Sequence, residues 1–450
     1  MLSRLPNSLF LSALFGLCTL PACGDEPKPA STQQQAQQQV ALPPAIDYPD
    51  SWLLGVEPAK HVAIIEDHSD ALLYWLEQGR SQRTVLHIDT HDDSRVVNDE
   101  TIQHLAAFAD AKDYTTLKDK SGVAYSTGGK VFNIGNFLYA GYRLGVVREV
   151  IWVLPARPQD LVNISQVQGY LENVGFDRAS AQTFHLEDGV IRGKRAGMPM
   201  VICTSQTIPP QREAVLLSLD IDYLMGKHQD PISSPMLQAT LNLFNELAAS
   251  KIVTDDALVS YSVHGGSIPV MHKYTGDYLA ELLRNPSMLK QPLPRLWQER
   301  DRLLATRAQG DIDTALVMAT NLVNLEPGNA SVHMEQSFAL LQANDVEASI
   351  QSMTMATQLD PSYLLGFLEL ALVVGQSSNF AADQKDPVID QIFAAAGEIF
   401  GLPADGVDRV QKCANHYHEG EYRRAQIELF RLVEDSVSAA ELEVFIPANG

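Results

Sequence analysis

The sequence predicts an α/β domain, in which helices cover both faces of a parallel sheet, followed by an all-helical region. The first observation is that apolar segments of strand length alternate with helical segments across residues 48–285. This alternation is typical of parallel sheets whose strands are buried on both faces. The second is a proline-marked junction at 286–300, after which only helical patterns continue. About 240 residues are enough for one large core, so we treat 48–285 as one domain.

The chain begins with a stretch, residues 1–22, that resembles a bacterial lipoprotein signal peptide. Arg4 precedes an apolar segment, 9–20, which is too short to span a bilayer comfortably. The segment Leu20-Pro21-Ala22-Cys23-Gly24 then resembles a lipobox. The resemblance implies cleavage before Cys23 and lipid attachment to its thiol, and Gly24 favours the outer membrane. The alternative is an ordinary secretory signal with an incidental cysteine.

Residues 23–47 are rich in proline, glutamine, alanine and serine, a composition that cannot bury enough apolar surface to fold. We interpret them as a disordered tether that holds the rest of the protein in the bacterial cell envelope, facing the periplasm. The net charge of −22 argues against nucleic acid as a partner, leaves the lipid as the only membrane contact, and would attract a cationic substrate. A bridge between Cys203 and Cys413 stays open, but too few cysteines remain for a cysteine-rich zinc cluster.

Six apolar segments are expected to form strands, and four helical segments are expected to connect or cover them. The expected strands are 61–66, 84–89, 149–154, 199–204, 214–221 and 257–263. The expected helices lie near 68–79, 132–145, 162–173 and 234–249.

Acidic residues follow two of these strands in an alternating pattern. Asp89, His91 and Asp93 come at the end of one strand, and Asp220 and Asp222 at the end of another. Alternate side chains of an extended chain share one face, and sites in α/β sheets lie at the carboxyl ends of strands. Carboxylates gathered in this way repel one another unless a cation is present. Oxygen-rich ligands with one or two imidazoles suit Mn²⁺, although each acid could instead cap a helix or turn.

These motifs resemble those of the arginase/agmatinase (ureohydrolase) superfamily. Residues 89–93 look like its Asp-Ala-His-x-Asp motif, and 218–222 look like its Ser-x-Asp-x-Asp motif. Residues 66–69, with His68, are similar to its Gly-Gly-Asp-His-Ser motif but lack both glycines. Together with 135–138, the arrangement is closest to the peptide-arginase branch. The resemblance covers about 48–285 and implies the three-layer fold shared by arginases and deacetylases.

The resemblance also implies a centre with two manganese ions. One ion would take His68, Asp89, Asp93 and Asp220, and the other would take His91, Asp89, Asp220 and Asp222. Asp89 and Asp220 would bridge the ions, and a water between them would attack a carbon atom. In arginases this carbon belongs to a guanidinium group. A small guanidino compound or an arginine-containing peptide is therefore the first substrate expected, with urea and ornithine as products.

The sequence departs from arginases at two positions that matter for chemistry. A long insertion follows Asp93, and His104 is a poor match for the histidine that shuttles protons in arginases. The glutamate that contacts the guanidinium is also missing after the last expected strand, where His264 and two glycines stand instead. His264 could serve as the acid or base, or it could form a hydrogen bond in a turn.

Two other functions stay open on the sequence alone. Deacetylases of the same fold hold a single zinc ion, so a zinc-dependent deacylase is the first alternative. The second is a scaffold without catalytic activity that binds protein partners through its helical region.

A repeat of 34 residues marks the helical region, 295–450. Leu325-Glu326-Pro327 recurs as Leu359-Asp360-Pro361, and Gly310-Asp311 recurs as Asn344-Asp345. This is the period of tetratricopeptide repeats, and Gly420-Glu421-Tyr422 resembles the middle of a further repeat. We expect three to four helical hairpins in a short solenoid, with a generic helical bundle as the alternative.

Overall fold

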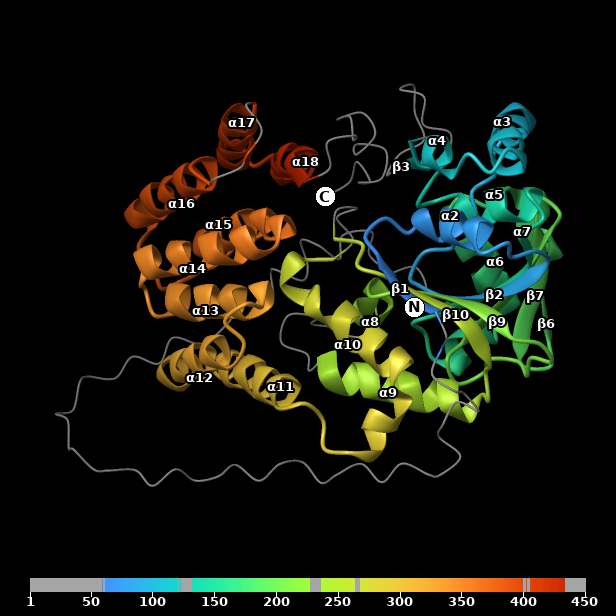
Figure 1. Cartoon of the computed structure of the whole chain (residues 1–450), viewed down its shortest axis with the longest axis horizontal. Coiled ribbons are helices and arrows are strands. Elements are labelled where there is room, and N and C mark those ends of the chain that lie inside the picture. Colours follow the sequence, from blue (N-terminus) through green and yellow to red (C-terminus); the bar gives the residue numbers. More distant parts are fainter. Residues whose placement is uncertain are drawn as a thin grey trace.

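The computed structural model describes residues 59, 61–119, 121–122, 132–226, 236–263, 268–399, 402 and 405–433. The expected signal peptide and tether, with Cys23, and the candidate His264 lie outside these residues. Figure 1 shows two parts side by side: a twisted sheet with its helices, and a stack of helices that follows in the chain. Cys203 and Cys413 are free and buried. In the described part of the chain, no helix is long and apolar enough to cross a membrane.

An eight-stranded sheet forms the centre of the first part, with the strand order β1-β10-β9-β2-β5-β8-β7-β6. The strands are β1 His61–Ile65, β2 Arg83–Ile88, β5 Val147–Leu154, β6 His185–Glu187, β7 Val190–Arg195, β8 Met198–Thr204, β9 Val215–Asp220 and β10 Thr254–Ser260. The strands from β1 to β8 in this order pair in parallel, and β7 and β6 add an antiparallel edge. The predicted α/β class with a mostly parallel sheet is confirmed, and all six expected strands are present with shifted ends.

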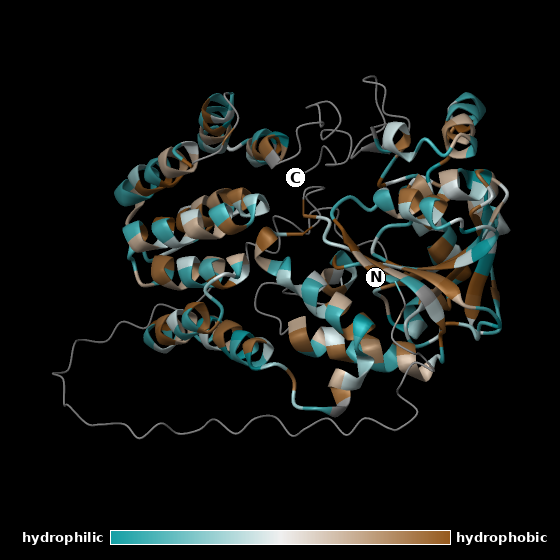
Figure 2. Ribbon diagram, in the orientation of Figure 1, coloured by the Kyte–Doolittle hydropathy of each residue, from teal (hydrophilic) through white to brown (hydrophobic). Residues whose placement is uncertain are grey.

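Two hydrophobic clusters cover the two faces of this sheet. Val85 and Val150 pack with α2 (Asp70–Glu77), α5 (Phe137–Arg143) and α6 (Ile164–Asn173). The next residues of the same strands, Leu86 and Ile151, pack with α9 (Met236–Ala249) and α10 (Tyr274–Arg284). Because successive side chains of a strand point to opposite faces, helices lie on both sides of the sheet. This arrangement is consistent with a three-layer fold, and Figure 2 shows its central strands as hydrophobic.

Several elements of this part were not expected from the sequence. They are the edge strands β6 and β7, the short strands β3 (Ser121–Gly122) and β4 (Phe132–Asn133), and the helices α3 (Asp99–Asp110), α4 (Tyr114–Asp119), α7 (Arg178–Thr183), α8 (Asp222–Gly226) and α10. The insertion after Asp93 therefore folds in part as α3 and α4. His104 lies on α3, which Figure 1 shows at the periphery of the sheet domain.

The helical part consists of successive α-helices. They are α11 (Arg295–Ala308), α12 (Ile312–Leu325), α13 (Ala330–Gln342), α14 (Val346–Leu359), α15 (Leu365–Gln376), α16 (Ala382–Gly397), α17 (Gly406–His418) and α18 (Tyr422–Val433). Figure 1 shows them as a curved stack.

The 34-residue repeat corresponds to two equivalent turns in this stack. Gly310 and Asn344 both adopt positive φ angles, 77° and 61°, in the turns before α12 and α14. Asp311 and Asp345 follow them and cap these helices. The side chain of each aspartate accepts a hydrogen bond from the backbone N–H of the residue three positions later. Glycine and asparagine are the residues that most readily adopt this backbone conformation. Assignment of the stack to the tetratricopeptide repeats stays a prediction.

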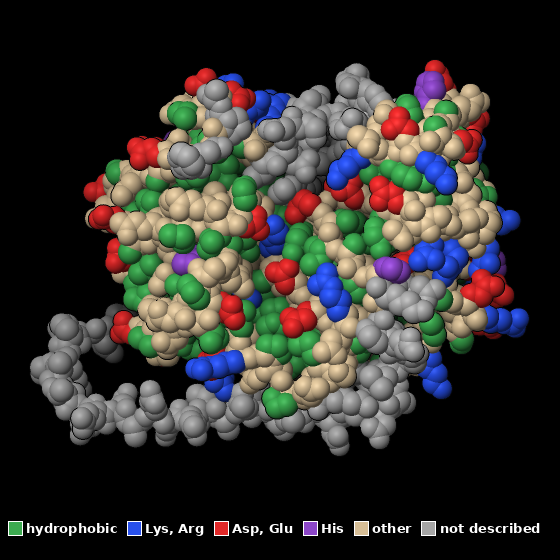
Figure 3. Space-filling view, in the orientation of Figure 1, with side chains coloured by type: hydrophobic (Ala, Val, Ile, Leu, Met, Phe, Trp, Pro, Cys, Tyr) green, Lys and Arg blue, Asp and Glu red, His purple; other side chains and the backbone are tan. Residues whose placement is uncertain are grey.

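The helical stack is docked on the sheet domain through the segment that begins at Ile268. Glu369 of α15 accepts a hydrogen bond from the backbone N–H of Val270, and both groups are buried. Lys273 forms an ion pair of 2.7 Å with Asp360, and Arg300 of α11 donates to the Tyr278 hydroxyl at 2.8 Å. Figure 3 shows acidic side chains along the boundary between the two parts on this face.

Candidate metal centre

The carboxyl ends of four neighbouring strands, β1, β10, β9 and β2, lie at one edge of the sheet. Asp89 directly follows β2, and Asp220 ends the adjacent strand β9. His68 comes three residues after β1, in the turn before α2, and Asp222 begins α8. The sheet order thus brings together side chains that are far apart in the sequence, because parallel strands end at the same edge.

His68 stands at the centre of a buried group of carboxylates. Its Nδ1 atom lies 3.1 Å from Asp89 Oδ2, 3.2 Å from Asp93 Oδ2 and 3.4 Å from Asp220 Oδ2. The other ring nitrogen, Nε2, is 2.6 Å from the Ser218 hydroxyl, which fixes the orientation of the ring. All four side chains of this group are buried.

A second group forms around His91 on the exposed side of the first. His91 Nδ1 lies 2.8 Å from Asp222 Oδ2 and 3.3 Å from Asp89 Oδ1. Asp89 therefore directs one carboxylate oxygen to each histidine. The His91 side chain is 60 % exposed, whereas those of Asp89 and Asp222 are 1 % and 3 % exposed. The second group thus borders solvent while the first is enclosed.

Asp89, His91 and Asp93 come together in a different way from the one expected, which was alternation along an extended strand. Strand β2 ends at Ile88, so Asp89, His91 and Asp93 are not alternate residues of one extended strand. Asp93 adopts a φ angle of 44°, which bends the chain and returns its carboxylate toward His68. The three side chains still meet, but they do so because the loop folds back.

Neighbouring residues hold the carboxylates in place. Thr90 donates from its hydroxyl to Asp222 Oδ2 at 2.6 Å and from its backbone N–H to Asp222 Oδ1 at 3.1 Å. The Ser262 hydroxyl donates to Asp220 Oδ2. Asp92, inside the acidic motif, faces away from the histidines and forms a buried ion pair with Arg195 of β7.

Burial and mutual repulsion disturb the titration of the acids. Burial, with the charges of Asp222 and Asp220, raises the pKa of Asp89 to about 6, and burial with the charge of Asp89 raises the pKa of Asp93 to about 7. Burial alone would lower the pKa of His68, but the surrounding carboxylates of Asp220, Asp89 and Asp93 favour the charged imidazole and raise this pKa well above its usual value. A bound cation would keep these acids ionised by adding the positive charge that they lack.

The donor atoms fit a metal ion. His68 Nδ1 and Asp89 Oδ2 are buried and have no hydrogen-bond partner among the described residues. Asp89, His91 and Asp222 form one group whose ligand atoms lie within 4.8 Å of one another, and His68, His87 and Asp89 form another. Buried His and Asp groups of this kind could hold a metal ion.

His87 is the residue of this centre that the sequence analysis missed. It lies on β2, is fully buried, and places Nε2 3.4 Å from Asp89 Oδ2. Its ring centroid is 5.2 Å from that of His68. The signal was present in the sequence, since His87 precedes Asp89 by two residues and side chains of a strand alternate.

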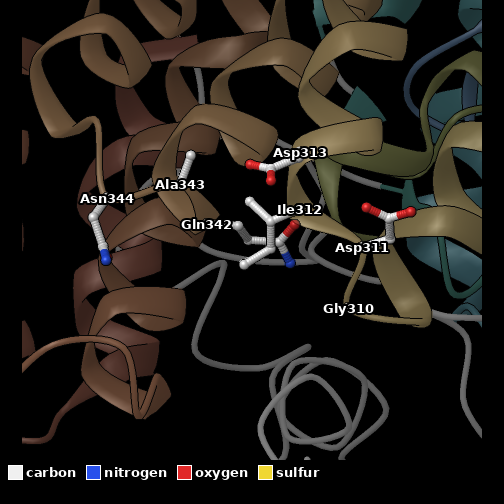
Figure 4. A pocket seen from close by; sticks show the side chains of 7 residues that line it. All are labelled: Gly310, Asp311, Ile312, Asp313, Gln342, Ala343 and Asn344. Carbon is white, nitrogen blue, oxygen red and sulfur yellow. The ribbon is translucent and has the colours of Figure 1, made fainter. Parts of the chain in front are cut away.

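A hollow of 420 Å³ lies elsewhere, between two turns of the helical stack (Figure 4). Its lining consists of 310–313 and 342–344, the equivalent turns of the 34-residue repeat. The two aspartates labelled in Figure 4 come from the start of α12, where Asp311 caps the helix and Asp313 lies in its first turn. Turn formation explains these residues, so the hollow adds no functional site.

The fold and the buried cluster are compatible with an arginase-like fold. No family model, curated protein or solved structure matches the chain. The functional conclusion therefore depends on the geometry of the metal centre itself.

Proposed function

We propose that this protein is a hydrolase with two metal ions that cleaves a carbon–nitrogen bond. The observation that supports it most is the position of Asp89, whose Oδ2 faces the buried His68 group and whose Oδ1 faces the His91 group. A carboxylate with one oxygen toward each of two imidazoles could contact two ions. The buried ion would be held by His68, Asp89, Asp93 and Asp220, and the outer ion by His91, Asp89, Asp220 and Asp222.

Two Mn²⁺ ions would supply the chemistry by lowering the pKa of a water molecule and orienting it for attack. The chain orients the ligands: Ser218 holds the His68 ring, and Thr90 holds Asp222. The exposure of His91 leaves this side of the centre open to a substrate. A guanidino group, as in a small guanidino compound or a peptidyl arginine, is the first substrate to test, and its hydrolysis would yield urea and ornithine.

A zinc-dependent deacylase is the second candidate, because the two ligand groups are unequal. The His68 group is enclosed, whereas the His91 group borders solvent, so a single ion would prefer the buried position. The third candidate is a scaffold, in which the helical stack binds a peptide or protein partner. Metal stoichiometry separates the first two, and the absence of any bound metal would favour the third.

The site of action would be the bacterial cell envelope. We propose that lipid on Cys23 anchors the protein to the outer membrane, with residues 23–47 as the tether and the folded parts in the periplasm. Labelling with a radioactive fatty acid tests this anchor, since Cys23→Ser should abolish the label.

Metal content is the first experiment for the enzyme itself. We expect the full chain, purified in detergent, to contain about two manganese ions when analysed by elemental mass spectrometry. Asp89→Ala and Asp220→Ala should each lose both ions and the release of urea from arginine peptides. Asp99→Asn is the matched control, because Asp99 pairs with Arg143 and is 78 % exposed. Full activity in the Asp89 variant would contradict the bridging role.

A further inference from the structure

His87 occupies an unusual place for an imidazole. It lies within β2, between Leu86 and Ile88, which belong to the hydrophobic cluster on the other face of the sheet. Its own side chain is turned toward the carboxylates and packs against His68 and Phe137. Burial of a polar ring costs free energy unless the ring gains partners there. Its Nδ1 atom has no hydrogen-bond partner among the described residues, so the protein around the ring satisfies only one of its two nitrogens.

The second ring nitrogen of His87 lies among the ligand atoms of the buried metal position. His87 Nε2 is 3.4 Å from Asp89 Oδ2 and 3.8 Å from Asp93 Oδ2. Ligands that share a six-coordinate ion with bonds of about 2.1 Å lie about 3 Å apart when adjacent and about 4 Å apart when opposite. The His68 Nδ1 atom keeps similar distances, 3.1 and 3.2 Å, to the same two oxygens. The two imidazoles thus lie close to the same pair of carboxylate oxygens, and the ligand atoms of His68, His87 and Asp89 lie within 4.8 Å of one another.

We propose that His87 is an additional ligand of the buried ion, through Nε2, and that it shifts this position toward metals that prefer nitrogen. The inference rests on the proposed two-metal function, to which it adds a ligand and a metal preference. With His68 and His87 the buried position has two imidazoles, whereas the outer position has only His91. Imidazole ligands suit Zn²⁺ and Fe²⁺, carboxylates suit Mn²⁺, and Co²⁺ stands above Mn²⁺ in the general order of affinity for nitrogen and oxygen ligands. The two positions would therefore differ in metal preference.

A hydrogen bond is the competing role for the same nitrogen. The carbonyl oxygen of His91 lies 3.2 Å from His87 Nε2, so a protonated Nε2 would donate to it. His87→Gln separates the two roles, because a glutamine amide reaches a similar position and can donate, but is a weak ligand for these metals. His185→Gln is the matched control, since His185 lies on the exposed edge strand β6.

The test compares metal binding by the full chain and its variants. We expect His87→Gln to reduce the preference for Co²⁺ over Mn²⁺ at least tenfold and to change the visible absorption of the Co²⁺ protein. His185→Gln should change neither. An unchanged preference and spectrum in His87→Gln would overturn the inference while leaving the two-metal function intact. No metal binding by the wild-type chain would overturn both.

A second measurement needs no variant. X-ray absorption of the fully Zn²⁺-loaded wild-type chain reports the number of imidazoles per ion. Three imidazoles shared by two ions support ligation by His87, whereas two imidazoles shared by two ions exclude it.

Discussion

Buried charges are balanced differently in the helical stack and in the metal centre. In the stack, Arg307 and Glu335 are both buried and lie 3.1 Å apart, so each neutralises the other. In the centre, the ion pairs of Asp89 and Asp93 within the described residues are all with histidines. The first arrangement is complete within the chain. The second gathers more acid than its histidines can balance, and this excess is what indicates an external cation.

The largest expected effect comes from breaking the complete pair. Arg307→Ala should reduce the free energy of unfolding by about 3–5 kcal/mol, because it leaves the Glu335 carboxylate buried without its partner. Chemical denaturation measures this loss. The double variant Arg307→Met/Glu335→Leu should recover most of it, since an apolar pair needs no charge balance. A loss below about 1 kcal/mol in the single variant would show that the pair is not buried as described.

The opposite pattern is expected in the candidate metal centre, where the effect of one substitution on stability should change sign when metal is bound. Without metal, Asp93→Asn should stabilise the protein, because it removes a buried charge from a group of like charges. With Mn²⁺ at 100 to 1,000 times its dissociation constant, the wild type should gain about 3–4 kcal/mol that the variant lacks. Thermal unfolding with a chelator and with added manganese measures both. If Asp93→Asn changes stability in the same direction with and without manganese, the contrast between the stack and the candidate metal centre is wrong.

Glu369 sharpens the comparison, because it is a buried acid of the stack that has no basic partner among the described residues. Burial raises its pKa to about 8, although its hydrogen bonds with the backbone of Val270 and Met271 act in the opposite direction. A carboxyl with a raised pKa stabilises the fold below its unfolded value, near 4.5, and loses this contribution as the pH rises through 8.

We therefore expect Glu369→Gln to unfold at the same temperature as the wild type near pH 4. At pH 7 the free energy of unfolding of the variant should exceed that of the wild type by about 2–3 kcal/mol, since the glutamine side chain cannot become charged. Calorimetry across this range measures the difference between the two proteins. A difference that does not vary with pH would show that Glu369 titrates normally.

The smallest expected effect concerns the support of a ligand. Thr90→Val should weaken metal binding about tenfold, because Asp222 loses the hydroxyl that orients it. Titration with Mn²⁺ measures the affinity. Thr90→Ser keeps the hydroxyl and should bind metal as the wild type does; equal weakening in both variants would point to packing instead.

The sequence predicted the parts of the molecule that follow a simple pattern. The central strands are continuous apolar runs because they are buried on both faces, and β9 is buried along its whole length. Edge strand β6 was missed because its three residues are all exposed, and its one apolar residue stands between two polar ones. In strand β7 apolar and polar residues do not alternate regularly, and the strand includes Gly193. Neither β6 nor β7 therefore has the continuous apolar run that marks a buried strand.

The same reasoning explains what was found and missed in the centre. Asp89, Asp93 and Asp220 were predicted because acidic residues after apolar strands are conspicuous, whereas His68 was predicted from the resemblance of residues 66–69 to a family motif. His87 was missed because it lies inside the apolar run of β2, where the pattern indicates a strand and nothing more. The role of Asp92 depends on Arg195, which lies on the strand that the pattern did not predict. Whether the helical hairpins are tetratricopeptide repeats, and what they bind, stays a prediction.

The strand order has a consequence for the synthesis of this protein. Ser260, at the end of β10, forms a hydrogen bond with Glu66, which is 194 residues earlier, and His68 contacts Ser218, 150 residues later. At about 5–20 residues per second, the ribosome would need roughly 10–40 seconds between these segments. A nascent chain would hold His68 for that time without the strands that complete its surroundings. Metal capture would therefore be among the last events in the maturation of the chain, after translation has passed β10.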